Sequence, residues 1–288
     1  MPARRSLAVA LALALGLGLG LAATATAAPA PEATRVMFVG DSITGSPGCW
    51  RAPLWVALSN AGYPVDAVGI NTVNECGDLA DAAGDPWDPD NTGIGGVTAT
   101  RMWIKLARDK VLEEHQPQVI VQLLGTNDLL GGSSAEEILA EYHQLLELYR
   151  NYDPGIRVVV GTPPPLDSGV CGCDAAQAEL ASALPGWAAG ASTPESPVMV
   201  ADLSTGFDPA TDTDDGIHPN ESGNAKLAAA WLPVIEGALD AAPASESPAP
   251  EIPADREAPE PSGGSWPLLA LVAVVIAAGV GVAVRRRS

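Results

Sequence analysis

The sequence predicts an α/β fold with three layers, α/β/α, in which helices cover both faces of a five-stranded parallel sheet. Two features of residues 34–240 support this prediction. Short apolar runs alternate with segments of helical spacing, an order that is typical of parallel sheets. The runs are apolar throughout rather than at every second residue, as expected for strands buried on both faces. We therefore predict one domain at residues 34–240, long enough to bury a sizeable core.

The predicted strands are short runs rich in Val, Ile and Leu, a composition typical of buried strands. They lie at residues 35–39, 65–70, 118–124, 156–160 and 197–201. The first run ends at Gly40 and the third at Gly125, and glycine commonly marks the turn after a strand. The carboxyl ends of both strands are therefore predicted to lead into tight turns.

The predicted helices lie between these strands, at residues 53–61, 98–114, 133–151, 174–184 and 221–239. The clearest is 133–151, because Ser134 is followed three residues later by Glu137, the pattern of a capping box. Pro233 is predicted to kink the last helix, since proline cannot donate the helical hydrogen bond. Residues 71–96 are rich in Asp, Gly and Asn. They are too long for a plain connection, which predicts a functional loop.

The two ends of the chain have a different composition. Residues 1–28 place two arginines before an apolar run and small residues, the order of a secretory signal peptide. Residues 241–265 are rich in Pro, which predicts a disordered stalk. Residues 266–284 carry no charge and are long enough to span a bilayer, and the basic tail 285–288 is predicted to stay in the cytoplasm. We therefore predict an exported domain anchored at the cell surface by a C-terminal transmembrane helix.

The charge of the chain is strongly acidic, with a formal net charge of −20. Such a surface repels phosphate polymers and anionic lipid headgroups, so we do not expect a nucleic-acid partner. Neutral substrates are compatible with it. The sequence implies no protein partner.

The four cysteines are Cys49, Cys76, Cys171 and Cys173. In an oxidising compartment they allow three pairings, and spacing alone does not choose among them. We favour Cys49 with Cys76, a pair that would clip the long loop after the second strand, while Cys171 and Cys173 could close a short local ring. A zinc site is the alternative, but no second C-x-x-C and no paired histidines support it.

Polar motifs follow three of the predicted strands. Gly40-Asp41-Ser42 follows the first, Gly125-Thr126-Asn127 follows the third, and Asp215 and His218 lie beyond the fifth. Ligands bind at the carboxyl ends of strands in parallel sheets, so we expect these motifs to meet. A hydroxyl, an imidazole, a carboxylate and an amide donor are the groups that acyl transfer requires. No G-x-S-x-G elbow is present, which disfavours an α/β-hydrolase fold.

These motifs resemble the SGNH (GDSL) hydrolase superfamily. The resemblance rests on GDSIT at 40–44, GTND at 125–128 and DGIHPN at 215–220. It implies a flavodoxin-like SGNH hydrolase fold and a glycine N–H that contributes to the oxyanion hole. Gly96 is the favoured glycine and Gly95 is the alternative. The spacing is most similar to carbohydrate esterase family 3 and its acetylxylan-esterase relatives, although these tend to have His-Ser and Trp around the glycine.

The resemblance implies a serine esterase of the carboxylesterase type, with Ser42 as nucleophile, His218 as base and Asp215 as its partner. Ser42, Gly96 and Asn127 would form the oxyanion hole. We expect short acyl esters, above all acetyl esters on carbohydrate, as substrates, and neither a cofactor nor a metal. A lipase, lysophospholipase or acyltransferase of the same fold is the first alternative. A non-catalytic carbohydrate-binding module is the second.

Several other polar residues are interpreted as structural. Asp41, Asp128 and Asp214 are predicted to anchor loops through backbone amides. His115 and His143 lie within helical patterns and are predicted surface or packing residues. The acidic loop around Asp85, Asp88, Asp90 and Asn91 carries oxygen ligands suited to Ca²⁺, but it lacks regular ligand spacing, so a solvated loop is the preferred interpretation.

Overall fold

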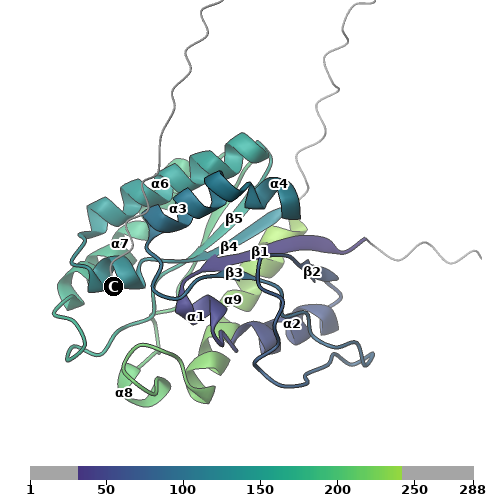
Figure 1. The fold of residues 1–288 in the computed structure, drawn as a ribbon, viewed down its shortest axis with the longest axis horizontal. Helices are drawn as coiled ribbons and strands as arrows, with labels where there is room; N and C mark the ends of the chain where they lie inside the picture. The colour runs from purple at the N-terminus through teal and green to yellow at the C-terminus, as the bar shows by residue number, and fades with distance from the viewer. Residues whose placement is uncertain (1–31, 242–288) are drawn as a thin grey trace, which may run out of the picture. The chain divides into compact units, whose positions relative to one another are not determined.

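The computed structural model of the chain describes residues 32–241, and in it a parallel sheet lies between two layers of helices (Figure 1). The strands are β1 (Thr34–Gly40), β2 (Val65–Ala67), β3 (Thr92–Gly93), β4 (Val119–Leu123), β5 (Arg157–Gly161) and β6 (Val198–Ala201). All paired strands are parallel. The predicted three-layer fold is confirmed, but the sheet has six strands rather than five.

The additional strand is β3, which lies within the predicted loop 71–96. It shares one edge of β1 with β2, because β2 pairs with the first residues of β1 and β3 pairs with Val39 and Gly40 at its end. A strand of two residues gives no periodicity that a sequence could reveal. Without β3, the order β2-β1-β4-β5-β6 is the flavodoxin-like order.

The helices divide between the two faces of the sheet. Their bounds are α1 (Ser42–Gly45), α2 (Arg51–Asn60), α3 (Ala99–Asp109), α4 (Val111–His115), α5 (Thr126–Leu130), α6 (Ala135–Tyr152), α7 (Asp174–Ala191), α8 (Pro209–Asp212) and α9 (Glu221–Asp240). Figure 1 shows α3 and α6 on one side of the sheet, with α2 and α9 on the other. The capping box predicted for Ser134 and Glu137 is present at the start of α6.

Alternate residues of β1 supply two cores. Met37 and Val39 pack in the core under α3, α4, α6 and α7, while Val36 and Phe38 pack in the core under α2 and α9. In the second core, Trp50 stacks on Trp231 with ring centroids 5.5 Å apart. Because both faces of the sheet are buried in this way, the carboxyl ends of the strands hold the motifs that follow them in fixed positions.

Two predicted helices differ from the observed helices by more than two residues or by a break. The pattern at 98–114 is interrupted at Lys110, whose φ of 53° ends α3 and begins α4; the break lets Val111 and Leu112 turn into the core. The pattern ending at Leu184 continues through Pro185 to Ala191, because Leu184 and Ala188 both pack against the sheet. Pro233 lies inside α9.

Two disulfides occur in the described domain. The favoured bond between Cys49 and Cys76 is present, with Cα atoms 5.3 Å apart, and Cys171 is bonded to Cys173. The first disulfide links the start of α2 to the loop between β2 and β3.

The predicted signal peptide, stalk, transmembrane helix and basic tail lie outside the described residues and stay predictions. Between residues 32 and 241, no helix combines the length and the apolar composition needed to cross a membrane.

Candidate active site

Ser42, His218 and Asp215 lie in hydrogen-bond contact. Ser42 is the first residue of α1, directly after β1, and its Oγ lies 2.8 Å from Nε2 of His218. Nδ1 of His218 lies 2.7 Å from Oδ2 of Asp215. In the tautomer that this arrangement favours, the serine donates to Nε2 and Nδ1–H donates to the carboxylate. The arrangement is that of a nucleophile, a base and an orienting carboxylate.

Asp215 also accepts hydrogen bonds from the backbone of its own turn. Its Oδ1 accepts the N–H groups of Ile217 at 3.0 Å and His218 at 2.8 Å. Partial burial is the largest single influence and raises the pKa of Asp215, but the hydrogen bonds from His218 and Ile217 together outweigh it and lower this pKa to about 2. The carboxylate is therefore ionised at neutral pH, as needed to orient the imidazole.

The turn that carries Asp215 and His218 is anchored by Asp212, a residue that the sequence analysis did not single out. Asp212 is fully buried and accepts hydrogen bonds from the Asp208 N–H at 2.7 Å, Ser222 Oγ at 2.9 Å and Lys226 Nζ at 2.6 Å. Its carbonyl also accepts the N–H of Asn220. These contacts join α8, the turn and the first turns of α9. The only available sequence signal was the run of aspartates before His218.

A second loop supports the same turn from the other side. The N–H of Asp167 donates to the carbonyl of Gly216 at 2.9 Å. A Cβ added at Gly216 would lie 2.8 Å from Cβ of Asp167 and 2.9 Å from Cγ2 of Val170. Gly216 also has a φ of 84°, a conformation that side chains rarely adopt. Glycine is therefore required between Asp215 and His218 for both reasons.

Asn127 connects the loops that carry Ser42 and Gly96. It lies in α5, and its Nδ2 contacts Oδ2 of Asp41 at 3.3 Å and the carbonyl of Val97 at 3.1 Å. Asp41 in turn caps α1, because its Oδ1 accepts the N–H of Ile43 at 2.9 Å. The structure therefore brings the residues predicted for the oxyanion hole to one end of the sheet.

The backbone at Gly95 and Gly96 is open. Both residues are exposed, Gly96 has a φ of 72°, and no hydrogen bond within residues 32–241 uses either N–H group. Both N–H groups are therefore available to a developing oxyanion, which such donors stabilise. Gly96 remains the favoured donor, with Gly95 as the alternative.

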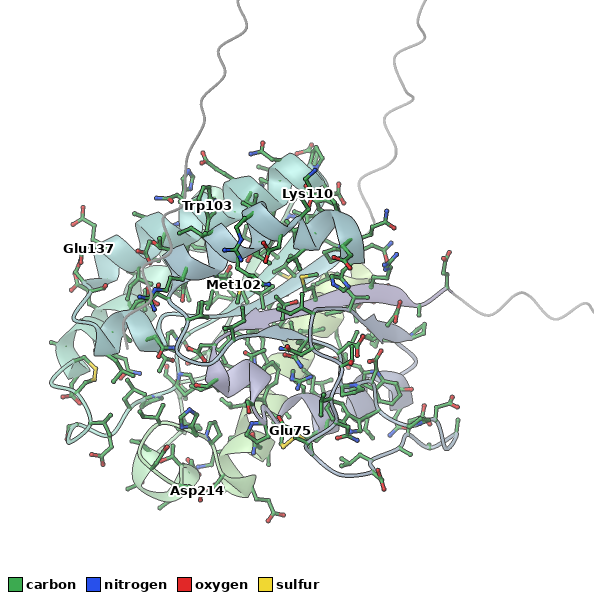
Figure 2. The ribbon with its side chains drawn as sticks, in the orientation of Figure 1. Glu75, Met102, Trp103, Lys110, Glu137 and Asp214 are labelled. Atoms are coloured by element: carbon green, nitrogen blue, oxygen red, sulfur yellow. A yellow bond between two sulfur atoms is a disulfide. The ribbon has the colours of Figure 1, made fainter. Side chains whose placement is uncertain are left out.

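Two carboxylates near this site are buried rather than solvated. Burial raises the pKa of Asp41 to about 6, with the hydrogen bond from the Ile43 N–H acting in the opposite direction. Burial, followed by the neighbouring Glu141 carboxyl group, also raises the pKa of Asp128, whose carboxylate accepts the N–H of Ala99. Both side chains contact backbone amides, as predicted. Asp214, in contrast, is exposed (Figure 2), and its own backbone N–H donates to the carbonyl of His218.

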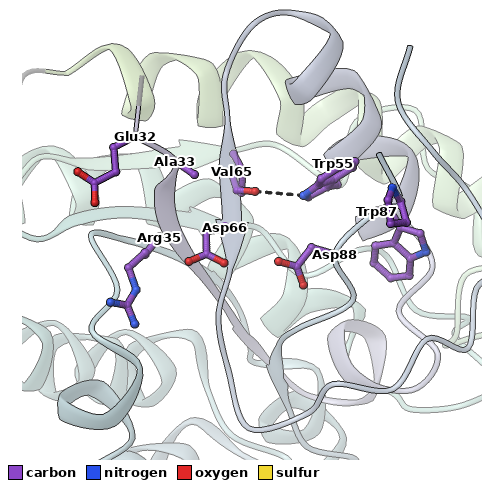
Figure 3. A pocket seen from close by; sticks show the side chains of 9 residues that line it. Glu32, Ala33, Arg35, Trp55, Val65, Asp66, Trp87 and Asp88 are labelled. Atoms are coloured by element: carbon purple, nitrogen blue, oxygen red, sulfur yellow. Dashed lines mark hydrogen bonds between the residues drawn. The ribbon is translucent and has the colours of Figure 1, made fainter. Parts of the chain in front are cut away.

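The other two histidines lie away from this constellation. His143 is exposed on α6, 3.6 Å from Glu147, and the carbonyl of His115 at the end of α4 accepts a hydrogen bond from Arg35. A cavity of about 700 Å³ also lies elsewhere, beside the first residues of β1 and β2 (Figure 3). There Trp55 Nε1 donates to the carbonyl of Val65 at 3.3 Å.

The family of the chain follows from comparison with known proteins. A model of the GDSL-like Lipase/Acylhydrolase family matches residues 38–226. The chain belongs to this family. Its GDSL-like domain is similar to an acetyl esterase mutant crystallised with acetate ion and to a carbohydrate esterase family 3 protein from Talaromyces cellulolyticus. Each is 31% identical with a TM-score of 0.62, and each match covers 72% of this chain and 98% of the other.

A relative outside the solved structures is the multidomain esterase of Ruminococcus flavefaciens, 28% identical over 242 residues. The match covers 77% of this chain and 31% of that protein, so the chain spans about a third of the relative's length. The predicted resemblance and fold are confirmed, and the GDSL-like domain belongs to a group of ester-hydrolysing enzymes.

Proposed function

We propose that the domain is a serine esterase that removes short acyl groups, above all acetyl groups, from carbohydrate. The observation that carries this proposal is the unbroken hydrogen-bond chain from Ser42 through His218 to Asp215. A serine hydroxyl becomes a nucleophile when an adjacent base takes its proton and a third group orients that base. Membership of an ester-hydrolysing family supports the same reaction.

In the proposed mechanism, Ser42 Oγ attacks the ester carbonyl while His218 Nε2 accepts its proton. Asp215 holds the imidazole in the tautomer with its proton on Nδ1 and stabilises the imidazolium that forms. The N–H groups of Ser42 and Gly96 stabilise the oxyanion, and Asn127 Nδ2 joins them by releasing its long contact with Asp41. His218 then protonates the leaving alcohol. Water, activated by the same imidazole, releases the acid from the acyl-enzyme.

The proposed substrate class is supported by the relatives and by the charge of the chain. Two similar solved proteins are described as an acetyl esterase and a family 3 carbohydrate esterase. The net charge of −20 repels anionic lipid surfaces, so a neutral acetylated carbohydrate is favoured over a phospholipid. The two disulfides support action in an oxidising compartment, in agreement with the predicted export to the cell surface.

The experiment is hydrolysis of p-nitrophenyl esters, from acetate to decanoate, and of acetylated xylan by the full chain and by Ser42→Ala. We expect turnover that is highest with acetate and falls to background in the variant. Ser182→Ala is the matched control, because Ser182 is exposed on α7 and contacts none of these groups, and it should stay active. A Ser42→Ala protein with full turnover would exclude the mechanism. A preference for decanoate would point to a lipase instead.

A further inference from the structure

A second cavity lies beside the end of α1, the helical turn that the proposed nucleophile Ser42 begins, and has no role in the mechanism above. It has a volume of about 410 Å³, within the range of roughly 300–1,000 Å³ typical of small-molecule sites. Gly45 and Gly93 form part of its wall. Gly45 is the last residue of the single helical turn that Ser42 begins, so the wall lies about 5 Å along the helix from the nucleophile.

The part of the cavity wall formed by Gly45 and Gly93 consists of backbone atoms alone. A Cβ added at Gly93 would lie 2.3 Å from Cα of Gly45, and one added at Gly45 would lie 2.5 Å from the carbonyl oxygen of Gly93. The two chain segments touch directly, so no side chain can enter between them. Strand β3 is thereby held against α1, and this wall of the cavity keeps a fixed position relative to Ser42.

Asn71 presents a fixed hydrogen-bond acceptor to the cavity. The orientation of the Asn91 amide is set by two hydrogen bonds: its Oδ1 accepts the Gly93 N–H at 2.9 Å, and its Nδ2 donates to the carbonyl of Pro89. Asn71 Nδ2 then donates to Asn91 Oδ1 at 3.1 Å and to the Gly93 carbonyl at 2.7 Å. Both amide hydrogens are used. Within residues 32–241, no hydrogen bond engages Asn71 Oδ1.

Glu75 supplies a carboxylate to the same cavity. Among the described residues it forms no ion pair, and its one hydrogen bond, from Ser46 Oγ, is long at 3.4 Å. The loop around it is held by the disulfide between Cys49 and the adjacent Cys76. Figure 2 shows Glu75 on the same side of the domain as Asp214, which precedes the catalytic turn. The carboxylate is therefore exposed and largely free to accept hydrogen bonds.

The lining favours a neutral sugar. None of the eight lining residues is basic, which disfavours an anion. Acceptors at Asn71 and Glu75 suit the hydroxyl donors of a sugar, and Ile70 and Val73 offer apolar contact for its C–H groups. An acetyl group is too small to fill the cavity as well as the space at Ser42. An ester bound at Ser42 would reach this cavity through its alcohol side.

We propose that this cavity is a subsite for a neutral sugar unit on the alcohol side of the ester, with Glu75 and Asn71 accepting hydrogen bonds from its hydroxyls. The assignment rests on the proposed esterase function for its substrate. The binding of the sugar itself can be measured without turnover.

The first test compares two substrates in Glu75→Ala and in Glu136→Gln, a control on the distant helix α6. With acetylated xylo-oligosaccharides, we expect KM to rise about tenfold in Glu75→Ala, the loss that one hydrogen bond to a charged group commonly brings. With p-nitrophenyl acetate, kcat/KM should stay within twofold. An equal loss on both substrates, or no change on either, would overturn the subsite.

The second test separates the subsite from the esterase function. Xylotriose, cellotriose, mannotriose and chitotriose are titrated calorimetrically into the full chain carrying Ser42→Ala, with and without Glu75→Ala. Binding that weakens about tenfold on loss of Glu75 supports the subsite even if the wild type hydrolyses no ester. Absence of binding by all four sugars overturns the subsite, while turnover of p-nitrophenyl acetate by the wild type would leave the esterase in place.

Discussion

The candidate site has two halves that are held in different ways: the nucleophile half, with Ser42 and Asn127, and the base half, with His218 and Asp215. Asp41 is fully buried at the end of β1 and bonds to both the nucleophile turn and Asn127. His218 and Asp215 lie on a turn beyond the sheet, with 39% and 52% of their side chains exposed. The nucleophile half is positioned by the sheet itself, whereas the base half depends on a few polar contacts to Asp212 and Asp167. The two halves should therefore respond differently to substitution.

The largest effect is expected at the base. His218→Ala removes the proposed acceptor of the Ser42 proton, and we expect kcat to fall on the order of 10⁴-fold or more, with an unchanged melting temperature because the side chain is partly exposed. Ester hydrolysis and thermal unfolding are the measurements. His143→Ala, exposed on α6, is the control and should match the wild type. Comparable activity in both variants would reject His218 as the base.

A smaller loss of activity is expected at the nucleophile half. Asn127→Ala removes one oxyanion donor, which typically lowers kcat about 10²–10³-fold, and KM should change little. Asn151→Ala, exposed near the end of α6, provides the matched control. If Asn127→Ala changed KM alone, Asn127 would contribute to substrate binding and not to the oxyanion hole.

Substitution of Asp212 tests how the base half is held. Asp212→Ala removes the shared acceptor of Ser222 and Lys226, and we expect the free energy of unfolding to fall by about 3 kcal/mol, with kcat reduced about tenfold as the turn loosens. Urea unfolding and ester hydrolysis report the two effects. Asp214→Ala, whose side chain is exposed, should change neither quantity. Equal stability of the two variants would contradict the anchoring role.

The smallest effect concerns the pH dependence of stability. Burial raises the pKa of Asp41 from 3.8 to about 6, so the folded state favours the protonated acid. This contribution to stability is complete below about pH 4 and is lost as pH rises through 6. Asp41→Asn, which keeps a capping side chain, should therefore gain about 1–3 kcal/mol relative to the wild type between pH 4 and pH 8.

Urea unfolding of both proteins at several pH values measures this difference. A constant difference across the range would mean that Asp41 titrates normally in the folded state. Asp215, in the base half, has the opposite pH dependence, because its pKa is lowered. Its contribution to stability is lost as pH falls toward 2, and it is the same in both proteins.

The fold could be predicted closely because its strands are buried on both faces and so are apolar throughout. The runs at β1, β4 and β5 show this directly. β3 could not be predicted, since it consists only of Thr92 and Gly93 and exists because β1 offers an unpaired edge. The break at Lys110 was also hidden, because the apolar pattern continues on both sides of it.

The sequence by itself predicted the groups of the candidate site, a serine, a histidine and an aspartate in motifs that follow strands, and it favoured the disulfide between Cys49 and Cys76. Only the tertiary structure decided what holds these groups. The roles of Asp212, Gly216 and Asn71 depend on partners from neighbouring loops and helices. Hydrogen bonds and close contacts of this kind leave no periodicity in the chain, because they are created when separate segments pack together.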